Sequence, residues 1–143
     1  MPKIEVRLAQ HDYGFDAIDE AGISMKMDNS LSGGGQGYGV SPMQSMLMAL
    51  GGCSGIDIVS ILKKQRQPFT SIRLIIEGER EQDKAPALWE RIHVVFHIGG
   101  EVERSKAEYA AQLSIEKYCS VAETLRRAGC SISWDVAMAD DNA

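Results

Sequence analysis

The sequence has no excess of positive charge, no hydrophobic leader and few cysteines, and each absence excludes a class of protein. The formal net charge is −5 at pH 7 and the isoelectric point is near 5.2, which argues against a nucleic-acid binder because such proteins need a basic surface. Residues 1–7 lack the apolar run of a signal peptide. Three cysteines in 143 residues do not make the disulfide framework of a secreted protein. We therefore expect a cytoplasmic protein.

The distribution of apolar residues predicts a single α+β domain over residues 1–143. No linker or repeat divides the chain, and its length suffices for a substantial core. Short alternating segments bounded by turn residues indicate strands at residues 4–8, 13–17, 23–27, 71–80, 91–98 and 131–136. Helices are expected at about residues 104–114 and just after Cys119.

One long apolar segment, Met43–Leu62, has the length of a membrane span. Glycines interrupt this segment, and its single charged residue, Asp57, would be costly in lipid. A helix that is apolar nearly all round is also typical of the centre of a soluble domain or dimer. We therefore predict a central buried helix and no membrane association. Ser41 caps this helix in a capping-box pattern with Gln44, and Pro68 ends it.

Two features suggest a ligand site only weakly. The glycine-rich segment Gly33–Gly39 lacks both the P-loop ending and the Rossmann spacing, so a mobile surface loop is favoured, with a lid as the alternative. His93 and His97 share one face of a strand but lie about 13 Å apart, which is too far for one ion. His11 is isolated, and there is no Cys-x-x-Cys pair. We expect neither a metal ion nor a cofactor.

The cysteines are the remaining candidates for chemistry. Each can simply be a small buried side chain, and that interpretation is favoured for Cys130. Cys119 lies near a helix start, which lowers a thiol pKa. Cys53 lies in the middle of a helix among apolar residues, so a nearby cation would be needed to activate it.

The segments Ser41–Ser54 and Ser114–Val121 resemble the OsmC/Ohr superfamily, in particular its YhfA-like branch. The similarity runs in order over most of the chain. It implies a bacterial α+β protein with antiparallel sheets, in which two chains intertwine as an obligate homodimer and pack their long central helices together.

The resemblance also implies a redox function in defence against oxidative stress. In the peroxidases of this family, one cysteine attacks an organic hydroperoxide and a second closes a disulfide, which a dithiol then reduces. Carried over, Cys53 is the peroxidatic and Cys119 the resolving cysteine, both catalytic. Those enzymes use an Arg–Glu pair to activate the first thiol. This chain has Met43 at the glutamate position, and its first turn, residues 10–14, contains no arginine.

Three functions therefore stay open. The first is a thiol-dependent organic hydroperoxide reductase. The second is a homodimer that binds a small apolar ligand in an interfacial pocket, since Met43, Met46 and Met48 lie near the glycine-rich loop and methionine adapts to varied ligands. The third is a structural dimer whose thiols only pack.

Overall fold

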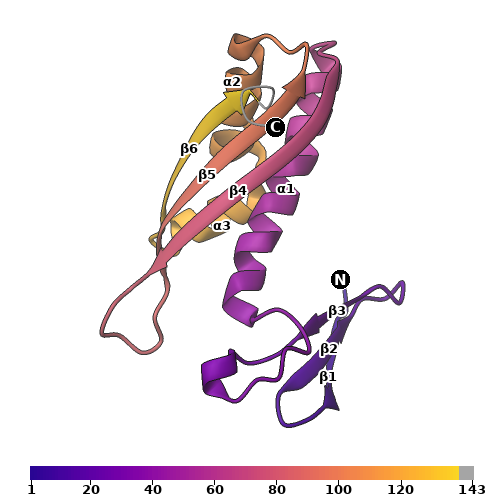
Figure 1. Cartoon of the computed structure of the whole chain (residues 1–143), viewed down its shortest axis with the longest axis vertical. Helices are drawn as coiled ribbons and strands as arrows, with labels where there is room; N and C mark the ends of the chain where they lie inside the picture. The colour runs from indigo at the N-terminus through magenta and orange to yellow at the C-terminus, as the bar shows by residue number, and fades with distance from the viewer. Residues whose placement is uncertain (139–143) are drawn as a thin grey trace. The chain divides into compact units, whose positions relative to one another are not determined.

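The structure is a computed structural model that describes residues 1–138. All six predicted strands and the predicted helices are present (Figure 1). The chain divides into two compact units, Met1–Met46 and a second unit that begins at Leu47. In chain order the elements are β1 (Glu5–Gln10), β2 (Gly14–Ile18), β3 (Ser24–Met27), η1 (Leu31–Gly33), α1 (Pro42–Lys64), β4 (Phe69–Arg80), β5 (Trp89–Gly100), α2 (Arg104–Leu113), η2 (Ser114–Tyr118), α3 (Ser120–Arg127) and β6 (Ser131–Met138).

The first unit is an antiparallel sheet of β1, β2 and β3 followed by the glycine-rich segment. This segment has a defined conformation because the buried carboxylate of Asp28 accepts hydrogen bonds from its backbone. The Oδ2 atom of Asp28 accepts from the N–H groups of Gln36 at 2.9 Å and Tyr38 at 3.0 Å. Gly35 is required here, since a Cβ at this position would lie 1.9 Å from the carbonyl oxygen of Asn29. The segment therefore wraps around Asp28.

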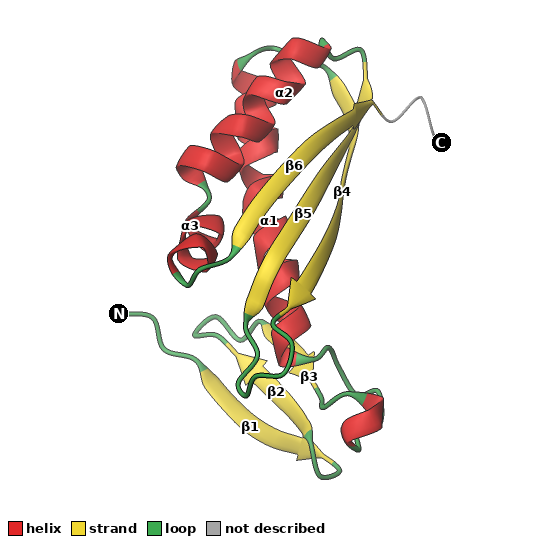
Figure 2. Cartoon of the chain, turned by 90° about the vertical axis from the view of Figure 1, so that its left-hand side faces the viewer, coloured by secondary structure: helices red, strands yellow, loops and turns green. Residues whose placement is uncertain are grey.

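The second unit contains a sheet in the order β4–β5–β6, with α1, α2 and α3 on one face (Figure 2). Strands β4 and β5 are antiparallel, as expected, but β6 runs parallel to β5. The expectation of purely antiparallel sheets was therefore wrong for this pair. The connection from β5 to β6 contains α2 and α3, and a helical crossover of this kind is what allows two neighbouring strands to run parallel.

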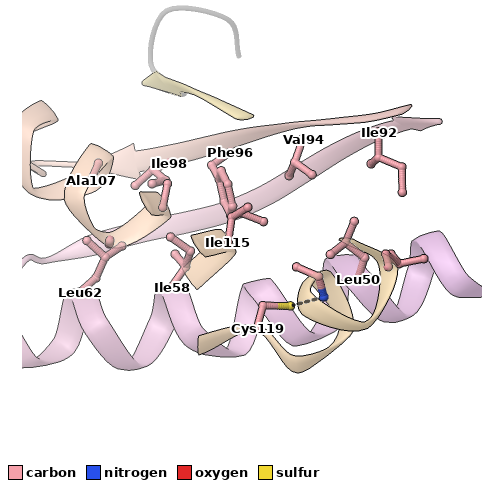
Figure 3. Close-up of a cluster of buried hydrophobic side chains, with 14 of the residues drawn as sticks. Leu50, Ile58, Leu62, Ile92, Val94, Phe96, Ile98, Ala107, Ile115 and Cys119 are labelled. Carbon is pink, nitrogen blue, oxygen red and sulfur yellow. Dashed lines mark hydrogen bonds between the residues drawn. The ribbon is translucent and has the colours of Figure 1, made fainter. Parts of the chain in front are cut away.

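The core lies between this sheet and its helices (Figure 3). Every second residue of β5 points inward, because successive side chains of a strand alternate between its two faces. Buried residues of α1 recur every fourth position, which places them on one stripe of the helix. The largest buried side chains are those of Leu50, Ile58, Leu62, Ile92, Val94, Phe96, Ile98 and Ile115.

Helix α1 has the predicted start, where the Oγ atom of Ser41 accepts a hydrogen bond from the backbone N–H of Gln44 at 3.3 Å. Within the single chain only one stripe of the helix is buried and Ile56 is 70% exposed, so burial on all sides stays a prediction. By length and composition alone the helix could cross a membrane, a test that core helices of soluble proteins also pass. Gly51 faces β4, where a Cβ would come 2.7 Å from the Cδ1 atom of Ile76. Here the glycine permits the side chain of Ile76 to pack closely against α1.

Candidate functional site

The second unit brings together the two cysteines singled out in the sequence. The Sγ atoms of Cys53 and Cys119 and a carboxylate oxygen of Asp57 all lie within 4.8 Å of one another. Cys53 and Asp57 come from α1, and Cys119 comes from the junction between η2 and α3. The two thiols therefore form a pair, and a carboxyl group that the sequence did not single out as functional completes a cluster of three.

Cys119 occupies the N-cap position of α3, where a side chain normally satisfies a free backbone N–H group. Its Sγ atom accepts a hydrogen bond from the N–H of Ala122 at 3.4 Å (Figure 3). A second donor is the hydroxyl of Ser54 on α1, at 3.5 Å. Both donors favour the thiolate form of Cys119 over the thiol. The cap also fixes the position of the sulfur relative to α1.

The position at a helix start does not lower the pKa of Cys119 overall, so this prediction was wrong. Cys119 is only 2% exposed, and its burial raises the pKa of the thiol above its ordinary value. The hydrogen bonds from Ser54 and Ala122 oppose this shift, and the neighbouring Cys53 reinforces it. Desolvation of the charged form outweighs the donors because almost no water reaches the sulfur. Cys119 is thus a poor first nucleophile.

Asp57 lies four residues after Cys53, so both side chains project from the same face of α1. The hydroxyl of Ser114 lies 3.2 Å from the Oδ2 atom of Asp57 and 3.4 Å from the backbone oxygen of Ser54, and its one proton can bond to either. Partial burial raises the pKa of Asp57, and the bond from Ser114 opposes this effect. The sequence did contain a signal that could have identified Asp57 as functional. It is the only charged residue in a long apolar segment, and it lies one helical turn from Cys53.

Three comparisons identify proteins that are similar to this chain. A model of the OsmC-like protein family matches residues 33–135. Protein YhfA from Escherichia coli strain K12 is 44% identical over 89 residues, which make up 62% of this chain and 66% of that protein. A crystal structure of a hypothetical protein from Aquifex aeolicus VF5 is 31% identical, with a TM-score of 0.80 over 96% of this chain and 97% of the other.

The chain belongs to the OsmC-like protein family. The resemblance to the YhfA-like branch is confirmed as well, although the aligned region spans just under two-thirds of YhfA. An organic hydroperoxide resistance protein OsmC from Legionella pneumophila has a TM-score of 0.73 with this OsmC-like protein, over 96% of this chain and 97% of the other. At 14% identity, that likeness shows a shared fold alone.

Other candidate residues of this OsmC-like protein lie outside the cluster. The Sγ atom of Cys130 is buried and donates to the backbone oxygen of Ser131 at 3.7 Å. His93 lies between two side chains of β6, with its Nδ1 atom 2.6 Å from the hydroxyl of Ser133 and its Nε2 atom 3.1 Å from Asp135. Metal ions are commonly bound by histidine, cysteine, aspartate and glutamate side chains. Among residues 1–138, Cys53, Asp57 and Cys119 form the only group of three such side chains close enough together to hold one ion.

An open cavity of about 320 Å³ is bordered by Cys119. Charged and polar groups from η2 and α3 surround it, among them one carboxylate, Glu123, which forms ion pairs with two arginines. The residues that line this cavity are Lys117, Tyr118, Cys119, Ser120, Glu123, Thr124 and Arg127. Of the three clustered residues, Cys119 is the one that lines this cavity.

Proposed function

We propose that this OsmC-like protein is a thiol-dependent reductase of organic hydroperoxides that serves in defence against oxidative stress. Cys53 is the peroxidatic cysteine and Cys119 the resolving cysteine. The observation that carries this proposal is the separation of the two Sγ atoms, which lie within 4.8 Å of each other although they come from distant parts of the sequence. The hydroperoxide resistance function named for the Legionella pneumophila relative supports the substrate class.

The reaction takes place in two steps at the cluster. The Sγ atom of Cys53 attacks the terminal oxygen of the hydroperoxide, so that an S–O bond forms, the O–O bond breaks and an alcohol leaves. Cys53 is then a sulfenic acid. The Sγ atom of Cys119 attacks the sulfur of Cys53, a disulfide forms and water leaves. A dithiol reductant restores both thiols by exchange and is itself oxidised to a disulfide.

The assignment of the two roles follows from exposure and hydrogen bonding. Cys53 is half-buried, whereas Cys119 is 2% exposed and its Sγ atom accepts two hydrogen bonds. A hydroperoxide therefore has better access to Cys53. Cys119 needs only to reach a sulfur that lies next to it, and the nearby second thiol protects the sulfenic acid from further oxidation. The cavity beside Cys119 then gives the reductant access to the disulfide.

A homodimer is part of the proposal. Large apolar side chains of α1 and β1 are exposed in the single chain, including Ile56 at 70% and Val6 at 57%. Apolar surface of this kind favours burial against another chain. Three free cysteines in one chain suit a reducing compartment, which supports a cytoplasmic location.

Titration with cumene hydroperoxide, followed by intact mass, tests this function. We expect the wild-type protein to lose two hydrogens as the disulfide forms. The Cys119→Ser variant should gain one oxygen at Cys53, and the Cys53→Ser variant should not react. Cys130→Ser serves as the matched control and should behave as the wild type. If Cys53 remains a free thiol after a stoichiometric amount of hydroperoxide, the proposal is wrong.

A second candidate function is the binding of a small apolar ligand. The first unit contains an open cavity of about 310 Å³ with mostly apolar walls, formed by Val6, Tyr13, Phe15, Met27, Asp28, Asn29 and Pro42. This size is at the lower end of the range for small-molecule sites. Native mass spectrometry of the purified protein, together with thermal shifts from a panel of fatty acids, tests this alternative. If no ligand is retained and no fatty acid shifts the melting temperature, ligand binding is excluded.

A further inference from the structure

Asp57 is placed to exchange protons with both thiols. Its carboxylate oxygen lies within 4.8 Å of the Sγ atoms of Cys53 and Cys119, a gap that one water molecule can bridge by two hydrogen bonds. Its other partner is the hydroxyl of Ser114. In the described part of the chain, no lysine, arginine or histidine forms an ion pair with Asp57. The two thiols are thus the ionisable groups that Asp57 faces.

The proposed reaction requires a proton carrier. A thiol that attacks a hydroperoxide must lose its proton, and the alkoxide that leaves must gain one. A carboxylate beside a thiol does not stabilise the thiolate, because the two negative charges repel each other. A carboxylate can instead accept the proton as the attack proceeds. The raised pKa of Asp57, caused by its burial, makes it a better proton acceptor than an ordinary carboxylate.

We propose that Asp57 is the general acid–base residue of this site, an inference that rests on the proposed function. In the first step, Asp57 takes the proton of Cys53 as the S–O bond forms and gives it to the alkoxide as the O–O bond breaks. In the second step, Asp57 takes the proton of Cys119 as the disulfide forms and gives it to the hydroxide that leaves as water. Each step returns Asp57 to the carboxylate.

The Asp57→Asn variant tests this role, because asparagine keeps the shape and can still accept the bond from Ser114. Two single-turnover rates of Cys53 are measured between pH 5 and about pH 9, spanning the ordinary ranges of carboxyl and thiol groups. One is the reaction with cumene hydroperoxide, which needs a proton for the leaving group. The other is alkylation by iodoacetamide, whose leaving iodide needs none. EDTA is present throughout, so that no metal ion occupies the thiols.

We expect the hydroperoxide rate to fall much further than the alkylation rate near neutral pH. Loss of the carboxylate should slow the hydroperoxide reaction by about 100-fold. Alkylation should slow much less, because it loses only the acceptor of the thiol proton, and removal of the neighbouring negative charge favours the thiolate. Asp57→Glu, which keeps a carboxyl group, should restore part of the hydroperoxide rate. Asp135→Asn removes an exposed carboxylate of β6 and should change neither rate.

Three outcomes would overturn the inference. If Asp57→Asn reacts with hydroperoxide as fast as the wild type, Asp57 does not transfer protons in the reaction, although the peroxidase function stands. If both rates fall by the same factor, Asp57 does not supply the proton to the leaving group. If the wild-type thiols do not react with hydroperoxide, the proposed function and the role of Asp57 fail together. Thermal unfolding of each variant checks that it is folded.

Discussion

The hydroxyl of Ser54 donates a hydrogen bond to the Sγ atom of Cys119 at 3.5 Å, which joins the central helix to the residue that caps α3. Ser54 is completely buried, and so is nearly all of Cys119. This bond is one of two that oppose the effect of burial on the pKa of Cys119. Because Ser54 directly follows Cys53 in the sequence, this bond couples the positions of the two thiols.

Replacement of Ser54 by alanine should slow disulfide formation. Without the hydroxyl, the pKa of Cys119 rises further, because one of its two donors is lost. Less thiolate is then present to attack the sulfenic acid of Cys53. Stopped-flow measurement of the second oxidation step after a hydroperoxide pulse should show a slower rate with an unchanged first step. Ser60→Ala on the exposed side of α1 is the matched control. An unchanged second step would show that this bond does not activate Cys119.

Cys119 also has a structural role that can be separated from its chemistry. Its Sγ atom caps α3, so Cys119→Ala leaves the N–H of Ala122 without a partner. We expect Cys119→Ala to lower the free energy of unfolding by about 1 kcal/mol. Serine is a good N-cap residue, so Cys119→Ser should be more stable than the alanine variant. Urea unfolding of reduced proteins measures the difference. Equal stability of the two variants would contradict the capping role.

The sequence predicted those features that depend on local patterns. Ser41 starts α1 as a cap, and the alternation along β5 gives its buried face. The parallel pairing of β6 with β5 was missed, because a short closing strand carries no signal of its direction. Direction is decided by where the helical connection ends, which is a property of the whole fold.

The site was predictable only in part. Cys53 and Cys119 were identified, but their proximity came from the family resemblance and not from their spacing. The helix start suggested a low pKa for Cys119, whereas burial raises it. Local sequence shows that a residue lies at a helix start, but it does not show how much water the rest of the fold excludes. For the same reason the role of Asp57 could not be assigned before its neighbours were known.

The exposed apolar side of α1 provides a test of the homodimer. Ile56 is 70% exposed within the chain, so a charged residue at this position should leave the fold of the chain intact. We expect Ile56→Glu to convert the dimer to a monomer in sedimentation velocity, with far-UV circular dichroism unchanged. Tyr109→Glu introduces the same charge on α2 at a side chain that is 54% exposed, and it should leave the dimer intact. A dimeric Ile56→Glu variant would show that this side of α1 is not the interface.

The glycine-rich segment should loosen at low pH because its conformation depends on an ionised Asp28. Hydrogen bonds from the N–H groups of Tyr38, Gln36 and Asn29 to the carboxylate hold its pKa below the ordinary value. A pKa that is lower in the folded than in the unfolded protein stabilises the fold above the unfolded value, which is near 4, and this stabilisation is lost as the pH falls through the folded value.

Amide hydrogen exchange at Gln36 and Tyr38 measures this effect. In the wild type, the protection of these amides should decrease as the pH falls below about 4, after correction for the intrinsic exchange rate. Asp28→Asn removes the charge at every pH, so its protection should be low already at neutral pH and should not change with acid. Asp19→Asn is the matched control, since this exposed carboxylate holds only the turn at Ala21 and Ile23. If Asp28→Asn protects these amides as well as the wild type, then the carboxylate does not hold the segment.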